Sequence, residues 1–235
     1  MLVTAAVCPH PPLLVPELAA GAAGELDPLR AACDEAVSTL LRADADLLVV
    51  VGDAPSVGPF PEGAWGSLRP YGVGIGVGDP GDGSAATLPL SLTIGRWLLD
   101  RQDPAPRTVF FGVSADSSAE RCRKLGATLA ERAPRVALMA MGDASARRSL
   151  KGPGYLDERA QPYDESVARA LAAADISALL ALDPHLSDEL LAAGRASWQL
   201  LAGAAEGEQR WSAALTFDRA PYGVTYLVAT WAVAR

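Results

Sequence analysis

The sequence predicts a single α/β domain with a mainly parallel or mixed central sheet and helices on both faces. Uniformly apolar segments such as residues 46–52 and 136–141 are typical of strands buried on both faces of a sheet. Amphipathic segments with helical spacing alternate with them, as in successive β-α-β units. Half of the 235 residues are hydrophobic, and no linker or internal repeat divides the chain. We therefore expect residues 1–235 to form one domain.

Each element follows from its periodicity and from the proline and glycine residues that bound it. The four prolines of CPHPPLLVPEL force an extended loop after the first strand, and the loops at 53–70 and DPGDGSAATLP are rich in proline or glycine. Strands are expected at residues 2–8, 46–52, 71–78, 109–113, 136–141, 211–217 and 224–233. Helices are expected at residues 25–42, 90–101, 117–132, 163–174, 187–193 and 197–205.

Three loops leave the carboxyl ends of predicted parallel strands, and ligand sites gather at this edge of α/β sheets. They span residues 9–17, 53–61 and 142–161, and each carries polar groups. The turn APYG adds an aromatic ring that suits the wall of a small-molecule pocket. We therefore expect a crevice whose candidate residues are His10, Asp53, Asp143, Ser145 and Tyr222.

Composition excludes several classes of partner. The net charge is −8, with 28 acidic and 20 basic residues, and the basic clusters at 121–124 and 147–151 are small. Nucleic-acid binding normally needs a broad basic face, so we expect no nucleic-acid partner. The most apolar run, residues 45–51, is too short to span a membrane, and the N-terminal segment lacks the positive region of a signal peptide. A cytoplasmic protein without a membrane partner is expected.

The three cysteines are widely spaced and form no CxxC pair, which argues against structural zinc and a disulfide framework. The glycines of GVGIGVGDPGDG alternate at period two rather than in a G-x-G-x-x-G pattern, so strand packing explains them better than nucleotide binding. Arg147, Arg148 and Lys151 beside Tyr155 could form an anion-facing lip, but solvated loop charges are the simpler interpretation.

Several motifs occur in order along nearly the whole chain: CPHPPLLVPEL, VVVGD, VALMAMGDASARR with GPGY and QPYDESVARAL, GRASWQLLAGAA, and APYGVTYLVATW. Together they resemble the class III extradiol ring-cleavage dioxygenases, the superfamily of the protocatechuate dioxygenase β-subunit, and within it an actinobacterial branch of alanine-rich proteins. The resemblance implies the α/β fold of those subunits and a tendency to form dimers.

Active members of that superfamily hold Fe(II) with two histidines and a glutamate, and a further histidine acts as acid and base. The resemblance carries the first ligand onto His10. The second histidine would fall beside Ala54, the catalytic histidine beside Ala146, and the glutamate at Gly194. Since the chain has only two histidines, His10 and His185, it cannot supply three. Orthodox ring cleavage is therefore not expected.

The remaining candidates each have a structural alternative. His10, Asp53 and Asp143 could hold a divalent metal such as Fe or Zn if they converge, whereas separately they would pin turns and cap backbone groups. The structural role is favoured for His10 and Asp53, and the two roles are balanced for Asp143. Ser145 has no adjacent base and no G-x-S-x-G context, so a turn hydroxyl is favoured over a nucleophile.

Three functions follow from these observations. The first is a dioxygenase-like protein with a degenerate iron site, without a cofactor, whose crevice binds a small molecule or a protein. The second is a metal-dependent oxidoreductase acting on an aromatic or other small acid through His10, Asp53 and Asp143. The third is a non-catalytic structural subunit of an oligomer, such as a homodimer.

Overall fold

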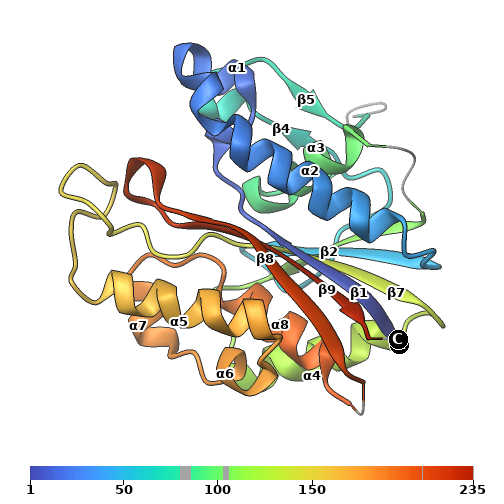
Figure 1. Ribbon diagram of the computed structural model, residues 1–235. Helices are drawn as coiled ribbons and strands as arrows, with labels where there is room; N and C mark the ends of the chain where they lie inside the picture. Colours follow the sequence, from blue (N-terminus) through green and yellow to red (C-terminus); the bar gives the residue numbers. More distant parts are fainter. Residues whose placement is uncertain (80–85, 103–105, 208, 235) are drawn as a thin grey trace.

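A computed structural model describes residues 1–79, 86–102, 106–207 and 209–234 of the chain. Its centre is a mixed seven-stranded sheet with the strand order β3-β6-β2-β7-β1-β9-β8 (Figure 1). The sheet consists of β1 (Leu2–Cys8), β2 (Leu47–Asp53), β3 (Gly58–Pro59), β6 (Thr108–Val113), β7 (Val136–Met141), β8 (Trp211–Arg219) and β9 (Tyr226–Val233). Strands β6, β2, β7 and β1 are parallel, whereas β3, β9 and β8 each pair antiparallel with their neighbours.

Helices cover both faces of this sheet (Figure 1). One layer contains α1 (Pro16–Ala19), α2 (Asp27–Leu41), α3 (Leu90–Asp100) and a two-stranded sheet of β4 (Gly66–Ser67) and β5 (Gly76–Val77). The other contains α4 (Ala119–Ala130), α5 (Ala160–Ala173), α6 (Ile176–Leu180), α7 (Pro184–Glu189) and α8 (Arg195–Ala205). Short 3₁₀ helices are η1 (Pro12–Leu14), η2 (Ala20–Leu26), η3 (Arg69–Tyr71) and η4 (Pro221–Gly223).

Each face of the sheet has its own apolar core, because successive side chains of a strand point to opposite faces. Every residue of β7 is buried, as expected for a strand covered on both sides. Helices α4 and α8 pack closely enough that a Cβ at Gly126 would overlap the carbonyl oxygen of Leu200, and one at Gly203 would overlap the backbone of Arg123. These two glycines allow the close approach of the helices.

The predicted α/β class and mixed central sheet are confirmed, and the parallel strands lie within about a residue of their expected ranges. The predicted strand at 71–78 is wrong in extent. Only the two-residue strand β5 forms there, since Gly72 and Gly78 have φ angles of 98° and 80°, which interrupt an extended strand. Helix α6, which Asp175 caps by accepting from the Ala178 N–H, was not predicted.

The glycine-rich expectations concern a segment that the structure describes only in part. Most of the DPGDGSAATLP loop, with the end of the glycine-rich GVGIGVGDPGDG run, lies at residues 80–85, outside the described residues.

Within the described ranges, no helix combines the length and apolar character that crossing a membrane requires.

Candidate functional site

The loops that follow the four parallel strands meet at one end of the sheet, where two neighbouring hollows open. The β1/β7 hollow has a volume of about 310 Å³ and is mostly apolar, with Pro11, Leu13, Asp143, Tyr222 and Tyr226 among its walls. Its residues come from the proline-rich loop, the loop after β7, the segment between α7 and α8, the turn between β8 and β9, and the start of β9. This is the edge at which the sequence predicts a crevice.

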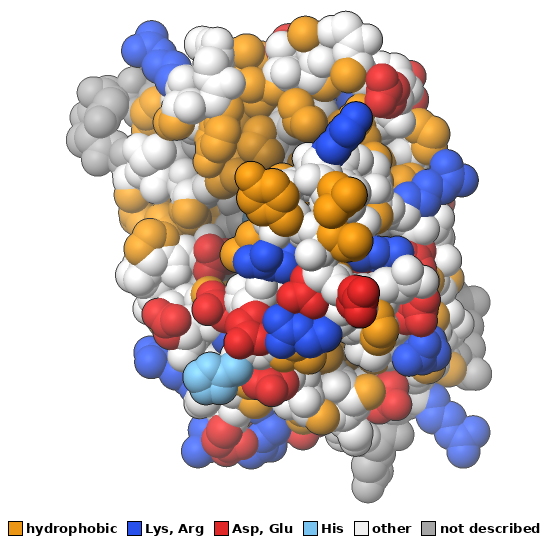
Figure 2. Space-filling model, turned by 90° about the vertical axis from the view of Figure 1, so that its left-hand side faces the viewer, with side chains coloured by type: hydrophobic (Ala, Val, Ile, Leu, Met, Phe, Trp, Pro, Cys, Tyr) orange, Lys and Arg blue, Asp and Glu red, His pale blue; other side chains and the backbone are white. Residues whose placement is uncertain are grey.

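The β2/β6 hollow is larger, at about 640 Å³, and more polar. Asp53 at the end of β2, Ser117 after β6, and His185, Asp188 and Arg195 from α7 and α8 contribute to its lining. Figure 2 looks onto this end of the molecule, with hydrophobic side chains gathered across its centre above a belt of charged ones. The two hollows therefore differ in chemistry although they share one edge of the sheet.

The segment between α7 and α8 separates the two hollows, because Leu191 and Ala193 line both. Leu191 has a φ of 56°, in the left-handed region. It ends α7 as a Schellman motif, in which its own N–H bonds the Asp188 carbonyl and the Ala192 N–H bonds the Ser187 carbonyl. A glycine normally occupies this position, so a leucine here stores backbone strain at the dividing wall.

His10 and Asp143, two of the predicted crevice residues, lie together. An Asp143 carboxylate oxygen accepts the backbone N–H of His10 at 2.8 Å, which ties the proline-rich loop to the segment after β7. The His10 Nδ1 atom is 3.8 Å from the same oxygen, too long for a hydrogen bond, and it has no other partner among the described residues. Asp143 thus has the backbone-capping role, and the Nδ1 atom of His10, a residue that is 7% exposed, is left without a partner.

Asp53 is not part of this pair. Its side chain lines the β2/β6 hollow, while its carbonyl oxygen accepts the Ser91 hydroxyl at 2.7 Å. Within the described part of the chain, no three His, Cys, Asp or Glu residues are grouped so that they could hold a metal ion. The convergence on which the three-residue metal hypothesis depends, that of His10, Asp53 and Asp143, is therefore not found among these residues.

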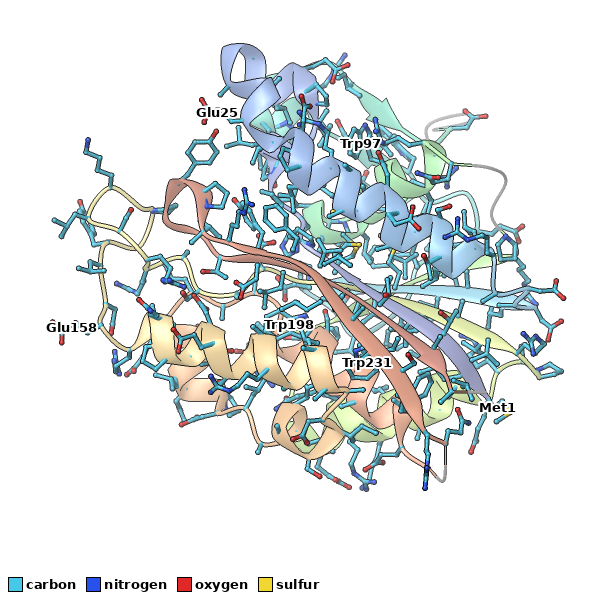
Figure 3. All side chains as sticks on the ribbon, viewed as in Figure 1. Met1, Glu25, Trp97, Glu158, Trp198 and Trp231 are labelled. Atoms are coloured by element: carbon cyan, nitrogen blue, oxygen red, sulfur yellow. The ribbon has the colours of Figure 1, made fainter. Side chains whose placement is uncertain are left out.

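Packing leaves no space for a side chain at Gly194, the position that the resemblance assigns to a ligand glutamate. A Cβ at Gly194 would overlap the indole ring of Trp198, which is fully buried four residues later on α8. Figure 3 shows Trp198 between the sheet and the helices of this layer. A Cβ at Gly142, directly after β7, would in turn overlap the backbone of Gly194. Packing at this point leaves no room for a carboxylate side chain.

Ser145, another predicted crevice residue, faces the protein interior. It is fully buried, and its hydroxyl donates to the Asp164 carboxylate at 2.7 Å, while its N–H donates to the other carboxylate oxygen at 2.8 Å. The Thr225 hydroxyl (2.6 Å) and the Arg148 guanidinium (3.1 Å) bind the same carboxylate. This arrangement satisfies a buried charge and joins α5 to the segment after β7, which is a structural role for Ser145.

Tyr222 lines the β1/β7 hollow and is 40% exposed. Its hydroxyl donates to the Glu25 carboxylate at 2.6 Å, and this hydrogen bond raises the pKa of the phenol. Glu25 lies above the loop that carries Tyr222 (Figure 3). In the same hollow, burial raises the pKa of Tyr226. Both rings therefore stay neutral and serve as walls rather than as acids near neutral pH.

Arg195 is a residue that the sequence analysis missed. It is 4% exposed, and its guanidinium donates to the Ser117 carbonyl at 2.6 Å, to the Gln199 side chain at 2.8 Å and to the Ala115 carbonyl. These bonds fix the loop after β6 against α8 at the β2/β6 hollow. The available signal was an arginine at the start of an otherwise apolar helix, GRASWQLLAGAA.

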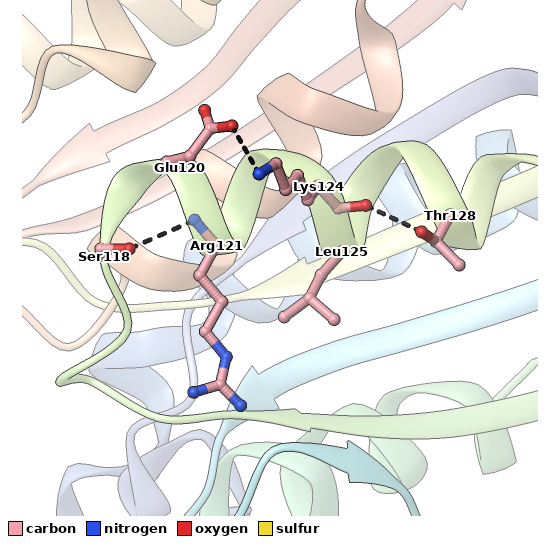
Figure 4. Close-up of a pocket in the computed structure, with 6 residues that line it drawn as sticks. All are labelled: Ser118, Glu120, Arg121, Lys124, Leu125 and Thr128. Carbon is pink, nitrogen blue, oxygen red and sulfur yellow. Dashed lines mark hydrogen bonds and ion pairs between the residues drawn. The ribbon is translucent and has the colours of Figure 1, made fainter.

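The basic groups near the crevice are mostly engaged. Arg148 binds Asp164, and the Arg147 guanidinium donates to the Gly154 carbonyl, so neither lies free on an anion-facing lip. A third hollow of about 380 Å³ lies along α4, where Lys124 pairs with Glu120 at 3.2 Å and Ser118 caps the helix through the Arg121 N–H (Figure 4). These contacts are local to the helix surface, as expected for a solvated cluster.

Comparisons with known proteins give a fold relationship. Neither the protein-family models nor the curated proteins include a match to this chain. Among solved structures, the chain is similar to uncharacterized protein JW3007 from Escherichia coli K12, with a TM-score of 0.59 and 14% sequence identity. The match covers 98% of this chain and 99% of that one, so the α/β architecture is shared over essentially the full length of both.

Proposed function

We propose that this chain is a class III extradiol dioxygenase-like protein without ring-cleavage chemistry, whose crevice binds a small molecule. The observation that carries the proposal is the packing of Trp198 against Gly194, which fills the space that a ligand carboxylate would need. A fold is retained more readily than its chemistry, so loss of the metal ligands with conservation of the frame is a coherent outcome.

The residues at the crevice do not fit a non-haem iron. The 2-His-1-carboxylate arrangement needs three donors that share one metal at about 2 Å each. Here His10 has Asp143 beside it and lines neither hollow, whereas Asp53 lines the β2/β6 hollow. The alternative metal-dependent oxidoreductase through these three residues is therefore less well supported than the binding function.

The β2/β6 hollow is the better candidate for ligand binding. It has about twice the volume of its neighbour and lies within the range of small-molecule pockets, about 300–1,000 Å³. The Ser117 hydroxyl there is buried without a partner among the described residues, and the half-buried Asp53 and the exposed Asp188 add two carboxylates to the lining. A polar ligand would satisfy the buried hydroxyl, which is costly to leave unpaired.

Iron loading tests the absence of ring cleavage. Purified protein is incubated anaerobically with Fe(II), then mixed with oxygen and either catechol or protocatechuate. We expect no oxygen uptake, no yellow ring-cleavage product, and an iron content equal to that of the His10→Ala variant. A yellow product formed by the wild type and abolished in His10→Ala would contradict the proposal.

Calorimetric titration tests the binding function, with protocatechuate as the probe. Ala193→Phe introduces a ring into the wall shared by both hollows and should abolish the heat of binding. Ala31→Phe, at an exposed position of α2, is the matched control and should bind as the wild type does. Equal binding by both variants would show that the probe occupies neither hollow, and no heat with the wild type would remove aromatic acids as ligands.

A further inference from the structure

Three aspartates line the β2/β6 hollow, and their carboxylates have no partner within the described part of the chain. Asp53 lies at the end of β2, Asp116 follows β6, and Asp188 belongs to α7. Asp53 is half-buried, and the other two are exposed. Their backbone atoms are bonded, but none of the three carboxylates has a hydrogen bond or an ion pair with a described residue. Three negative charges are therefore available to a ligand.

The basic groups of the same lining do not neutralise these carboxylates. Arg195 is 4% exposed, and its guanidinium donates to the carbonyl oxygens of Ala115 and Ser117 and to the Gln199 side chain, all of which are uncharged. His185 is exposed and has no ion pair within the described ranges. With histidine counted as neutral, three carboxylates against one guanidinium leave the lining net negative, which favours a cation over an anion.

A buried hydroxyl in this lining gives a second and independent indication of a ligand. Ser117 is 5% exposed, and its Oγ atom has no hydrogen-bond partner among the described residues. Leaving such an atom unpaired is costly. A serine oxygen has lone pairs that accept the N–H of an ammonium group, while nearby carboxylates balance the charge of that group. Hydroxyl and carboxylates are thus compatible with the same kind of ligand.

The spacing of the acidic groups favours an extended organic cation over a metal ion. No three His, Cys, Asp or Glu residues of the described part of the chain are grouped so that they could hold a metal. A metal needs its ligands to converge at about 2 Å, whereas an organic cation needs only one carboxylate for each ammonium group. Carboxylates on three separate elements therefore suit a ligand whose amines are separated by methylene groups.

The remainder of the lining suits an aliphatic chain. Its apolar members are mostly small: Ala115, Pro184, Leu191, Ala192, Ala193 and Ala196. No Phe, Tyr or Trp belongs to the lining within the described residues, so the hollow lacks the aromatic cage that recognises quaternary ammonium ions. The volume of about 640 Å³ is within the range of small-molecule pockets. Primary or secondary amines on an alkyl chain match this combination.

We propose that the β2/β6 hollow binds an aliphatic diamine or polyamine, which rests on the function proposed above, the binding of a small molecule by the crevice. The ammonium groups bind Asp53 and Asp188, one N–H donates to the Ser117 hydroxyl, and the methylene groups lie along the small apolar side chains. Charge-assisted hydrogen bonds to the carboxylates supply most of the affinity, so binding weakens as the salt concentration rises.

Calorimetric titration with spermidine tests the ligand class. The wild type should bind one spermidine per chain, and Asp53→Asn and Asp188→Asn should each lower the affinity at least fivefold. Asp44→Asn removes the same charge from an exposed aspartate between α2 and β2 that has no ion pair, and this matched control should bind as the wild type does. Circular dichroism verifies that each variant is folded.

Two results of this titration would overturn the proposal. The first is a wild type that gives no heat with spermidine. The second is an affinity that all three variants lower equally, or that none of them lowers, because spermidine is then held by the net charge of the surface rather than by the hollow.

Further probes separate the ligand class from the proposed function. Glutarate, a dicarboxylate, and choline, a quaternary ammonium ion, should give no heat. If protocatechuate or glutarate binds the wild type but not Ala193→Phe, and spermidine binds neither, the hollow takes an acid, so the proposed function stands and the amine class is wrong. If spermidine binds the wild type but not Ala193→Phe, both the binding function and the amine class are supported.

Discussion

Asp143 lies in the segment that follows β7, and Asp164 of α5 binds that segment, but the surroundings of the two carboxylates differ sharply. Asp164 is 2% exposed and binds two hydroxyls, a backbone N–H and a guanidinium. Asp143 is partly exposed and accepts one backbone N–H, beside an imidazole nitrogen that has no partner. One region is a closed network of satisfied polar groups, and the other is open.

This difference distinguishes polar residues that stabilise the fold from polar residues that are available to a ligand. A buried polar network that is fully satisfied makes the core specific, whereas buried polar atoms without partners indicate places where a ligand or water completes the bonding. Of the seven buried side-chain atoms without a partner among the described residues, five belong to the loops and the start of α8 at the carboxyl edge of the sheet (His10, Ser117, Arg147, Ser197 and Trp198), whereas those of Trp65 and Gln209 lie elsewhere. Buried polar atoms without hydrogen-bond partners therefore indicate the candidate site better than the residue types of its lining do.

The largest expected effect comes from breaking the closed network. Asp164→Ala leaves Arg148, Ser145 and Thr225 without their shared acceptor and should lower the free energy of unfolding by about 3–5 kcal/mol. Asp143→Ala removes one hydrogen bond and should cost about 1 kcal/mol. Urea denaturation of both variants measures the contrast. Equal losses would mean that the two aspartates do not differ as their hydrogen bonds indicate.

The next largest expected effect on stability comes from the packing of Trp198 against Gly194. Gly194→Ala forces a methyl group into the Trp198 indole and should destabilise the protein by about 1–3 kcal/mol. Trp198→Phe removes the overlapping part of the ring, so the double variant should be less destabilised than the sum of the single variants. Thermal and urea unfolding of all four proteins give the coupling. Simple additivity would show that the methyl group is accommodated elsewhere.

A pH-dependent effect is expected at the contact between α5 and α7. Burial raises the pKa of Tyr163 from 10.0 to about 12, and its hydroxyl lies 2.9 Å from that of Ser187. Folding favours the neutral phenol, so the stabilisation is complete below pH 10 and is lost as the pH rises toward about 12. Tyr163→Phe should cost about 1 kcal/mol at pH 7 and show a shallower loss above pH 10. Parallel alkaline profiles for the two proteins would refute this role.

The smallest expected effect on stability concerns the dividing wall. Leu191→Gly relieves left-handed strain of about 1 kcal/mol and removes a half-exposed side chain, so unfolding free energy should rise by at most that amount. The same change joins the two hollows and should alter ligand affinity. Calorimetry and urea unfolding together separate the two effects. A clear loss of stability would show that the packing of the leucine side chain outweighs the backbone strain.

The sequence alone determined the class of the fold and most of its elements, since uniform apolar runs and helical stripes are properties of short segments. It also determined that three histidines are not available, which is a matter of counting. His10 and Asp143 were placed at the same edge because each follows a parallel strand, and β1 and β7 are indeed neighbours. The strand predicted at residues 71–78 shows the limit of such local patterns, because only the two-residue strand β5 forms there. Alternating glycines have the period of a strand, but they provide no side chains to pack it against the core.

Only the tertiary structure decided which polar groups are satisfied. Strand order brings Asp53 to a different hollow from Asp143, and packing over nineteen residues of sequence brings Ser145 to Asp164. The close approach of Gly142, directly after β7, to Gly194 at the start of α8 likewise depends on how the helix packs against the sheet. Such contacts join residues from separate elements, so no local pattern encodes them. The sequence names the polar residues at the edge, and only packing determines whether each is a structural partner or a group left open to a ligand.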